Sequence, residues 1–475
     1  MVNWGCFTVV TPVYSTVIEV MKRIHLNYAL WGIALFFGAT LTVFSQHVAV
    51  TPANKNDDWW VERHTANVAQ MNRENIELMM IGDSITHGWD KNYWEMYYAK
   101  RKPINLGFSG DRTEHVLWRL DHLPLDKISP KAAMLMVGTN NVGHQSSPPK
   151  ETSEGIQAIV HRLQKAFPEM QILVLHVFPR DNKPDGEMRK KVDEINSFLP
   201  VLLKGEKNVT LLDINQKFLE ADGTLAPEMM PDFLHPKATG YGIWAQAVEP
   251  ILAKLLEEKN PAIEPIDRLS DPWWKDRHAD NAALMEKEEI GLLMIGDSIT
   301  HGWDNEKELW DETFGKYQPI NLGFGGDQTQ HVLWRLDRLP LEKISPKAAG
   351  IMIGTNNIGN PNNKNTPYQV AIGIRAIVEK LQKQYPDIKV LVLKVFPRSE
   401  PPDDMRRLKV NEINACLPIV LDGMKNVQLI GFGEKFLAPD GTLPGEIMPD
   451  FLHLSTEGYK IWADSIAPDL EKAMR

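Results

Sequence analysis

Residues 80–90 read MIGDSITHGWD, and residues 294–304 repeat the same eleven letters without a change. The stretch begins in an apolar run and continues into Gly-Asp-Ser, so Ser84 and Ser298 directly follow a predicted strand. A serine in this position can act as a nucleophile, although Asp-Ser is also typical of a helix cap. The repeat predicts two copies of one catalytic unit, and every further chemical residue can therefore be sought twice.

Other matched segments divide the chain into two domains. The offset between the copies grows only from 214 residues at Trp59 to 218 residues at His235. A period above 200 residues indicates a duplicated domain, because solenoid repeats run at roughly 20–50 residues. We predict one domain over residues 50–260 and a second over 266–475. Residues 261–265 contain two prolines and are predicted to form a short, stiff linker.

The composition is that of an ordinary globular protein, with 43% hydrophobic and 24% charged residues. A net charge of -10 without any basic run argues against a nucleic-acid partner. Only Cys6 and Cys416 are present, which excludes a disulfide framework and a thiolate metal site.

Residues 1–46 have the layout of an export signal. A cationic start at residues 21–23 precedes a largely apolar run over 28–44, and Ser45-Gln46 offers a cleavage point. A translation start at Met21 would remove the unusual segment in front of the signal. We expect a cleaved signal and a secreted or periplasmic protein. An uncleaved membrane anchor and a buried helix are the alternatives, because the apolar run lies at the short edge of a membrane span.

Each copy alternates short apolar runs with helical patterns. In the first copy the predicted strands are 76–81, 103–105, 133–137, 172–177 and 209–213, and the helices between them include 114–120 and 155–167. Continuous apolar strands separated by helices predict an α/β fold with a parallel sheet covered on both faces. The functional residues of such a sheet collect at the carboxyl ends of its strands.

A second motif, Asp-x-x-His, lies near the end of each copy. Asp232 precedes His235 by three residues, and Asp450 precedes His453 by the same spacing. One turn can hold the carboxylate against one imidazole nitrogen while the other nitrogen faces the serine. A capping aspartate beside a surface histidine would give the same pattern, but its recurrence at nearly the same distance from the serine favours catalysis.

Hydrolysis through a serine also needs fixed donors for the oxyanion that forms on the substrate. Glycine allows close approach of a backbone N–H, and asparagine offers a side-chain N–H. Each residue alone would suit an ordinary turn, but the ordered set recurs in both copies. The predicted donors are the backbone N–H groups of Ser84 and Gly110 with the Asn140 side chain, and those of Ser298 and Gly326 with the Asn356 side chain.

Further repeated residues carry weaker signals. His87 and His301 are expected to be structural or to line the pocket, and Arg180 and Arg398 to bind an anion or to form a helix-end salt bridge. We expect His115 and His331 in the core or at an interface. The tryptophans are expected in the core and at interfaces rather than as sugar platforms: Trp89, Trp94, Trp118 and Trp244.

This set resembles the SGNH (GDSL-type) hydrolase superfamily, whose nucleophile, glycine donor, asparagine donor and Asp-x-x-His match the residues above. Within it, residues 325–336, 354–357 and 450–454 resemble the catalytic alpha subunits of platelet-activating-factor acetylhydrolase. The resemblance covers nearly the whole of each repeat. It implies a flavodoxin-like three-layer (α/β/α) fold in each domain, and catalysis without a metal or an organic cofactor.

From the motifs and the resemblance we expect an exported serine esterase that removes short acyl groups, chiefly acetyl, from carbohydrate or small ester substrates through an acyl-serine intermediate. Ser109 and Pro236 are replaced by Gly325 and Leu454 in the second copy, outside the catalytic positions, so both sites are expected to be active. One alternative is a lysophospholipase or a lipid esterase like platelet-activating-factor acetylhydrolase. Another is a non-catalytic, glycan-binding tandem. The duplication also allows the domains to pack as an internal pseudo-dimer.

Overall fold

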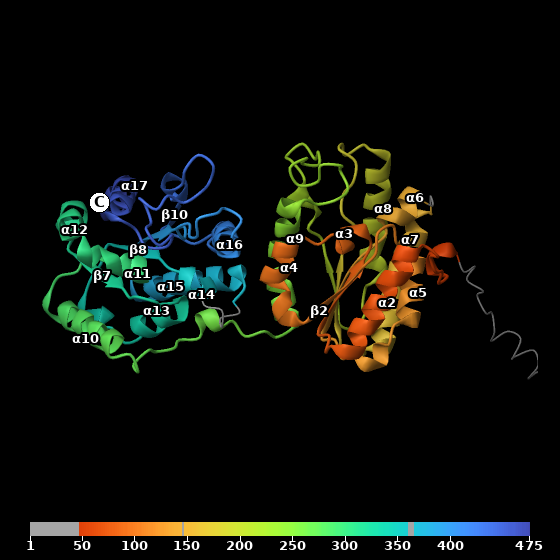
Figure 1. Cartoon of the computed structure of the whole chain (residues 1–475), viewed down its shortest axis with the longest axis horizontal. Coiled ribbons are helices and arrows are strands. Elements are labelled where there is room, and N and C mark those ends of the chain that lie inside the picture. The colour runs from red at the N-terminus through yellow and green to blue at the C-terminus, as the bar shows by residue number, and fades with distance from the viewer. Residues whose placement is uncertain (1–46, 145–146, 360–364) are drawn as a thin grey trace, which may run out of the picture.

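The computed structural model describes residues 47–144, 147–359 and 365–475, so the predicted leader lies outside the described residues. It consists of two domains, each built on a five-stranded parallel sheet flanked by helices (Figure 1). The predicted α/β class is confirmed in both. Across the described ranges, no helix combines the length and the apolar character needed to cross a membrane.

The first domain follows the predicted alternation of strands and helices. Its strands are β1 (Leu78–Gly82), β2 (Pro103–Gly107), β3 (Ala132–Met136), β4 (Gln171–Leu175) and β5 (Val209–Leu212). Its α-helices are α2 (Asp58–Arg73), α3 (Ser84–His87), α4 (Lys91–Tyr97), α5 (Thr113–His122), α6 (Thr139–His144), α7 (Pro149–Ala166), α8 (Glu187–Leu202) and α9 (Ala238–Leu255). All five predicted strands are present, each within two residues of its predicted start.

The second domain repeats this order. Its strands are β6 (Leu292–Gly296), β7 (Pro319–Gly323), β8 (Ala348–Met352), β9 (Lys389–Leu393) and β10 (Val427–Ile430). Its α-helices are α10 (Pro272–Lys287), α11 (Ser298–His301), α12 (Lys307–Phe314), α13 (Thr329–Leu336), α14 (Thr355–Gly359), α15 (Pro367–Gln384), α16 (Met405–Val420) and α17 (Thr456–Met474). The two domains therefore share one chain path from strand to strand.

The strand order is β2-β1-β3-β4-β5 in the first sheet and β7-β6-β8-β9-β10 in the second. This is the flavodoxin-like order, in which the chain reverses direction across the sheet between the first and third strands. A crevice opens at this switch point outside the carboxyl ends of the strands. The segments that follow β1, β2 and β3 carry Ser84, Gly110 and Asn140, so the topology brings them to one edge.

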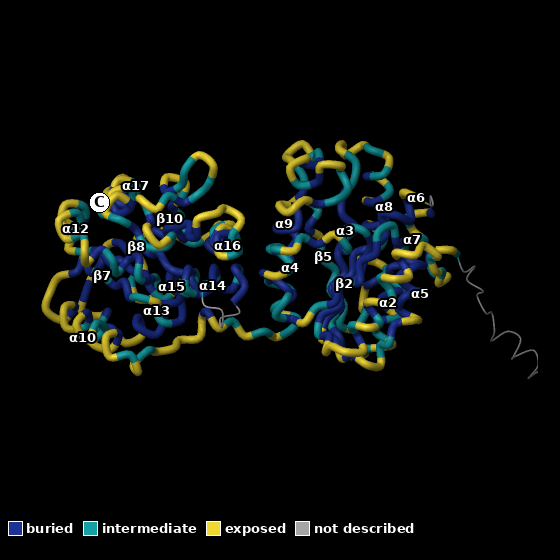
Figure 2. Tube along the Cα trace, viewed as in Figure 1, coloured by how far each residue is buried: buried dark blue, intermediate teal, exposed yellow. Residues whose placement is uncertain are grey.

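Helices cover both faces of each sheet, which gives the three predicted layers. In the first domain α2, α5, α7 and α8 pack on one face, and α4 and α9 pack on the other. Every residue of β1 and β3 is buried, which explains why these strands read as continuous apolar runs rather than alternating ones. Figure 2 shows the buried sheet between more exposed helices.

The segment between the domains contains a short 3₁₀ helix, η5 (Pro261–Ile263), that docks on the second domain. The Thr329 hydroxyl donates to the backbone oxygen of buried Ala262 at 2.7 Å. In the first domain η1 (Val48–Val50) docks in the same way, because Thr113 donates to the Ala49 oxygen at 2.8 Å. Part of the predicted linker thus matches the opening segment of the first domain.

The two domains contact each other through unlike faces. The first contributes α4 and α9, whereas the second contributes α15 and α16 (Figure 1). Tyr97 and Gln246 both donate to the buried Glu412 carboxylate, at 2.5 and 2.9 Å. Thr366 donates to buried Glu249 at 2.9 Å. Because the counterparts of α4 and α9 in the second domain are α12 and α17, the contact is heterologous rather than two-fold.

Candidate active site

Ser84 begins the short helix α3, directly after β1. The Asp83 side chain caps this helix by accepting the Ile85 N–H at 3.0 Å, and Asp297 accepts the Ile299 N–H at the same distance. The cap is therefore made by the aspartate and leaves the serine hydroxyl available. As the first residue of a helix, Ser84 also has a backbone N–H without an intrahelical acceptor.

The serine hydroxyl faces the predicted histidine in both domains. Ser84 Oγ lies 2.9 Å from His235 Nε2, and Ser298 Oγ lies 2.9 Å from His453 Nε2. On the other side of the ring, His235 Nδ1 lies 2.6 Å from Asp232 Oδ2. The second domain has the same 2.6 Å contact between His453 and Asp450. The structure thus brings the predicted serine, histidine and aspartate into one hydrogen-bonded chain, twice.

A tight turn holds the aspartate against the imidazole. Asp232 Oδ1 accepts the backbone N–H groups of Leu234 and His235 at 3.1 and 2.7 Å. Phe233, between them, has a left-handed backbone with φ of 55°. Burial raises the pKa of Asp232, but the hydrogen bonds from the His235 ring and backbone outweigh it and lower the pKa below its usual value. An ionised aspartate accepts a proton-bearing Nδ1, which leaves Nε2 free to accept the serine proton.

The pKa of the second aspartate of the region, Asp83, is shifted in the opposite direction. It is completely buried, and this burial raises its pKa to about 7, against the lowering effect of the Ile85 N–H. Burial also raises the pKa of Asp297 to about 7 in the second domain. Environments that shift the pKa values of two carboxyl groups in opposite directions give the two groups different roles. Asp232 and Asp450 carry the charge that faces histidine, whereas Asp83 and Asp297 serve as caps.

The predicted glycine and asparagine donors follow the two strands that pair with the strand before the serine, at the same edge of the sheet. Gly110 and Gly326 have φ values of 72° and 75°, a left-handed conformation that favours glycine. Among the described residues, neither of these N–H groups has a hydrogen-bond acceptor. Asn140 Nδ2 donates to the backbone oxygen of Asp111 at 3.0 Å, which orients the amide and leaves its second N–H available. Asn356 makes the equivalent 3.0 Å bond to Asp327.

Arg180 and Arg398 support the turn that carries each asparagine. The Arg180 guanidinium donates to both the backbone oxygen and the hydroxyl of Thr139 at 3.1 Å. Arg398 makes the same pair of bonds to Thr355 at 3.0 Å. These arginines therefore hold the first residue of α6 and of α14, and their observed contacts are hydrogen bonds to threonine rather than the helix-end salt bridge considered from the sequence.

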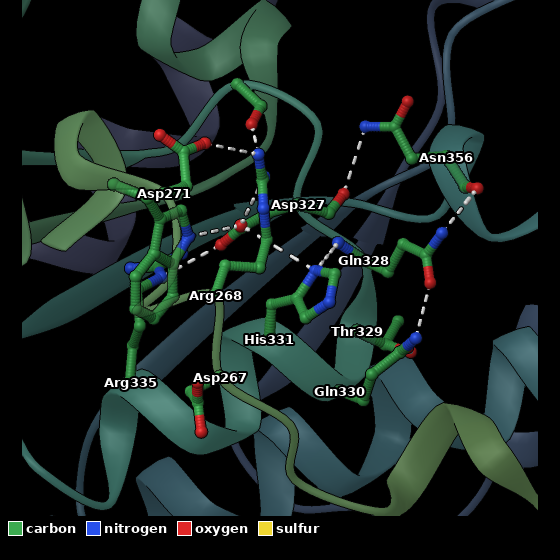
Figure 3. Close-up of polar contacts among 12 residues, drawn as sticks. Asp267, Arg268, Asp271, Asp327, Gln328, Thr329, Gln330, His331, Arg335 and Asn356 are labelled. Atoms are coloured by element: carbon green, nitrogen blue, oxygen red, sulfur yellow. Dashed lines mark hydrogen bonds and ion pairs between the residues drawn. The ribbon is translucent and has the colours of Figure 1, made fainter. Parts of the chain in front are cut away.

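Asp111 and Asp327 are central to the site but were not singled out from the sequence. The Asp111 carboxylate accepts Trp60 Nε1 at 2.8 Å and Arg119 Nε at 2.9 Å, and its backbone oxygen orients Asn140. Figure 3 shows the second-domain network around Asp327, with Asn356 on one side and Arg335 on the other. The signal was present in the sequence, since an aspartate directly follows the donor glycine in both copies.

The histidine that follows the nucleophile motif differs between the domains. His87 Nδ1 lies 2.9 Å from the Ser109 hydroxyl, and its ring stacks on Trp59. Gly325 replaces this serine in the second domain, where His301 instead lies 3.5 Å from the Asp304 carboxylate. The part of the chain described by the structure contains no cluster of three or more histidine, cysteine or acidic side chains suited to a metal ion.

The buried tryptophans lie mainly in the core. Trp89 and Trp244 are 8% and 1% exposed, and their rings lie 4.4 Å apart in the apolar cluster beneath α9. His115, 3% exposed, accepts the Arg112 N–H at 3.1 Å at the start of α5. These positions agree with the core roles expected from the sequence.

Comparison with known proteins places both domains in one family. The family model of the GDSL-like lipase/acylhydrolases matches residues 80–243 and 294–461. The chain is 37% identical over 205 residues to platelet-activating factor acetylhydrolase IB subunit alpha2 of Rattus norvegicus, covering 42% of this chain and 86% of that protein. It is 36% identical over 205 residues to the human alpha1 subunit, with the same coverage.

Solved structures with similar folds include a GDSL-like lipase from Bacteroides thetaiotaomicron, 24% identical with a TM-score of 0.36. That match covers 42% of this chain and 97% of the lipase. An acetylxylan esterase from Geobacillus stearothermophilus is 19% identical with a TM-score of 0.32, covering 40% of this chain and 97% of that enzyme.

The family match spans both repeats and includes the serine motif of each, which confirms the resemblance stated from the sequence. It also excludes the non-catalytic alternative. The chain is an ester-hydrolysing enzyme and belongs to the GDSL-like lipase/acylhydrolase family, with two of its domains in tandem.

Proposed function

We propose that both domains are serine esterases that remove acetyl and other short acyl groups from carbohydrate or small ester substrates. One observation carries this proposal: in each domain a serine oxygen lies 2.9 Å from an imidazole whose other nitrogen contacts an aspartate at 2.6 Å. This is the arrangement needed to activate a hydroxyl group at neutral pH.

In the proposed reaction His235 Nε2 takes the proton of Ser84 as its oxygen attacks the ester carbonyl carbon. The oxyanion is stabilised by the N–H groups of Ser84, Gly110 and Asn140. The tetrahedral intermediate collapses, and the imidazolium returns the proton to the leaving alcohol. Water then attacks the acyl-serine with His235 again acting as base, which releases the acid and regenerates the serine. The second domain performs the same steps with its equivalent residues: Ser298, Gly326, Asn356, Asp450 and His453.

The exposure of the site supports an ester carried on a large substrate. The side chains of His235 and His453 are 43% and 45% exposed, and those of their aspartates are more exposed still. A reacting group at the surface can be reached by an acetyl group on a polymer. The acetyl preference is supported by the relatives, which are named acetylhydrolases.

A lipid substrate is the second candidate, favoured by the same relatives. Platelet-activating factor acetylhydrolase subunits are 36–38% identical to this chain over 205 residues. An acetyl phospholipid would use the same chemistry and differ only in its leaving group.

A screen for acetate release would test the reaction and separate the candidate substrates. Acetylated xylan, simple acetyl sugars and an acetyl phospholipid should be compared with p-nitrophenyl acetate. Ser84→Ala together with Ser298→Ala should abolish turnover of every substrate, whereas each single variant should keep the activity of the other domain. Ser197→Ala, an exposed serine on α8, is the control. Substantial activity in the double variant would refute the nucleophile assignment.

We also propose that the chain is exported, because residues 1–46 have the layout of a secretion signal. Expression of the full chain, with recovery of the protein outside the cytoplasm and sequencing of its amino terminus, would test this. Retention of the intact leader would favour the membrane-anchor alternative, and cytoplasmic recovery would refute export.

A further inference from the structure

In each domain a cation reaches the loop that carries the glycine donor. Arg268 Nη1 donates to the backbone oxygen of Gly325 at 2.6 Å. In the first domain Lys55 Nζ donates to the backbone oxygen of Ser109 at 3.4 Å. Both cations come from the segment in front of the first long helix of their domain, far in sequence from the loop they contact. Figure 3 shows the Arg268 side chain among the polar groups beside Asp327.

The carbonyl that receives the cation belongs to the peptide whose N–H is the glycine donor. Gly325 C=O and Gly326 N–H form one planar unit, and its two polar groups point in opposite directions. A Cβ built on Gly326 would lie 3.1 Å from Arg268 Nη1, and one built on Gly110 would lie 3.1 Å from Lys55 Nζ. The cation therefore lies close to this peptide in both domains, while the N–H side has no acceptor within the described residues.

A charged donor on the carbonyl oxygen has two effects on the N–H of the same peptide. Charge-assisted hydrogen bonds are stronger than neutral ones, and bonds in series polarise one another, so the N–H becomes a better donor. The bond also restrains rotation of the peptide, which keeps the N–H aimed at the place where negative charge develops. Donors fixed before the reaction are the main source of oxyanion stabilisation.

We propose that Arg268 and Lys55 are positioning residues, which orient and polarise the glycine N–H of the oxyanion site through the Gly325–Gly326 and Ser109–Gly110 peptides. The inference rests on the proposed function of these sites as serine esterases.

The two domains reach this arrangement from equivalent sequence positions. Ala49 and Ala262, whose backbone oxygens accept Thr113 and Thr329, are 213 residues apart, and Lys55 and Arg268 share this offset. The repeat therefore supplies a cation to the same carbonyl in both domains, lysine in the first and arginine in the second. Arg268 is itself held in place, because its Nη2 donates to Asp271 at 3.0 Å. With the shorter and better-anchored bond, the second domain should depend more strongly on its cation.

The test uses the full chain with one site silenced. In a Ser84→Ala background, kcat and KM for uncharged p-nitrophenyl acetate report on the second domain alone. Arg268→Met should lower kcat about ten-fold, less than the loss of a whole oxyanion donor, with KM nearly unchanged. Arg268→Lys should recover most of the loss, because it restores a cation. Lys55→Met in a Ser298→Ala background should give a smaller decrease.

The matched control is Arg375→Met, which removes another arginine-to-carbonyl bond, 2.9 Å long to Val420 on the α15–α16 side. It should leave kcat unchanged. Thermal midpoints check that each variant is folded, and if Arg268→Met does not fold, Arg268→Gln replaces it in the comparison.

An unchanged kcat in a folded neutral variant, or no recovery with lysine, would overturn the inference. A rise in KM at constant kcat would also overturn it, since that pattern indicates a substrate contact. If the Ser84→Ala parent shows no turnover that depends on Ser298, the proposed function itself fails, and this result is recognised before any Arg268 variant is measured.

Discussion

At the scale of single residues, hydrogen bonds already made determine which donors are left for a substrate. Asn140 and Asn356 each use one amide N–H on a backbone oxygen at 3.0 Å. The amide is therefore fixed in orientation before a substrate arrives, unlike that of an exposed turn asparagine. Its remaining N–H can stabilise an oxyanion without further ordering.

Replacing both asparagines should therefore affect the chemical step rather than binding. We expect Asn140→Ala together with Asn356→Ala to lower kcat by roughly a hundred- to a thousand-fold, the usual effect of a lost oxyanion donor, with little change in KM. Steady-state kinetics on p-nitrophenyl acetate would measure this. A decrease of less than about ten-fold in a protein with an unchanged circular dichroism spectrum would contradict the assignment.

At the scale of elements, a partly buried histidine helps to attach the first long helix of each domain. His64 on α2 stacks on Trp60 and contacts Trp118 of α5, and His278 on α10 makes the equivalent contacts. Burial, with a further contribution from a nearby buried arginine, lowers the pKa of each histidine from 6.5 to about 4. Both rings are thus neutral in the folded protein at neutral pH.

These histidines make the free energy of unfolding depend on pH in the acidic range. Between pH 6.5 and about pH 4 the unfolded chain binds protons at these positions that the folded chain does not, so their contribution is complete above pH 6.5 and decreases as the pH falls. His64→Gln together with His278→Gln should flatten this part of the stability curve. Denaturant unfolding at pH 7 and pH 4.5 would measure it, with exposed His161→Gln as the control. Equal loss of stability in the double variant and the wild type would contradict the prediction.

At the scale of the whole molecule, the two domains meet at a contact whose residues differ from their counterparts in the other copy. Glu412 is buried and accepts Tyr97 and Gln246 of the other domain, whereas its counterpart Glu194 is exposed on α8. Thr313 occupies the position equivalent to Tyr97 in the second domain. The second domain therefore lacks the tyrosine that donates across this contact, and a head-to-tail repetition of the contact would lose that hydrogen bond. The packing of the domains as an internal pair in solution is our proposal.

Removing the shared acceptor should weaken this contact. Glu412→Leu leaves the buried Tyr97 hydroxyl without this acceptor, which costs about 1–3 kcal/mol, and also removes the acceptor of the partly buried Gln246, so it should lower the thermal midpoint. Burial raises the pKa of Glu412 despite the hydrogen bonds that lower it, so the charged form is disfavoured in the folded state. Glu412→Gln should therefore keep or increase stability at neutral pH. Scanning calorimetry would test this with Glu194→Leu as control, and equal effects of the two leucine variants would contradict a contact in solution.

The sequence by itself determined the duplication, the α/β class, the strand positions and the set of serine, glycine, asparagine, aspartate and histidine side chains. Each of these depends on local information: a continuous apolar run, a motif at a strand end, or a spacing of three residues. The repeat then doubled every signal. The parallel sheet brings these motif residues together, because the carboxyl ends of neighbouring strands meet at one edge.

Only the tertiary structure decided which group contacts the other side of the donor peptide, what Arg180 braces, and which faces join the domains. Lys55 and Ser109 are 54 residues apart, and no periodicity relates them. Glu412 is buried whereas its counterpart Glu194 is exposed, so comparing the two copies does not reveal its role. Contacts of this kind depend on the packing of distant segments, which a local pattern does not encode.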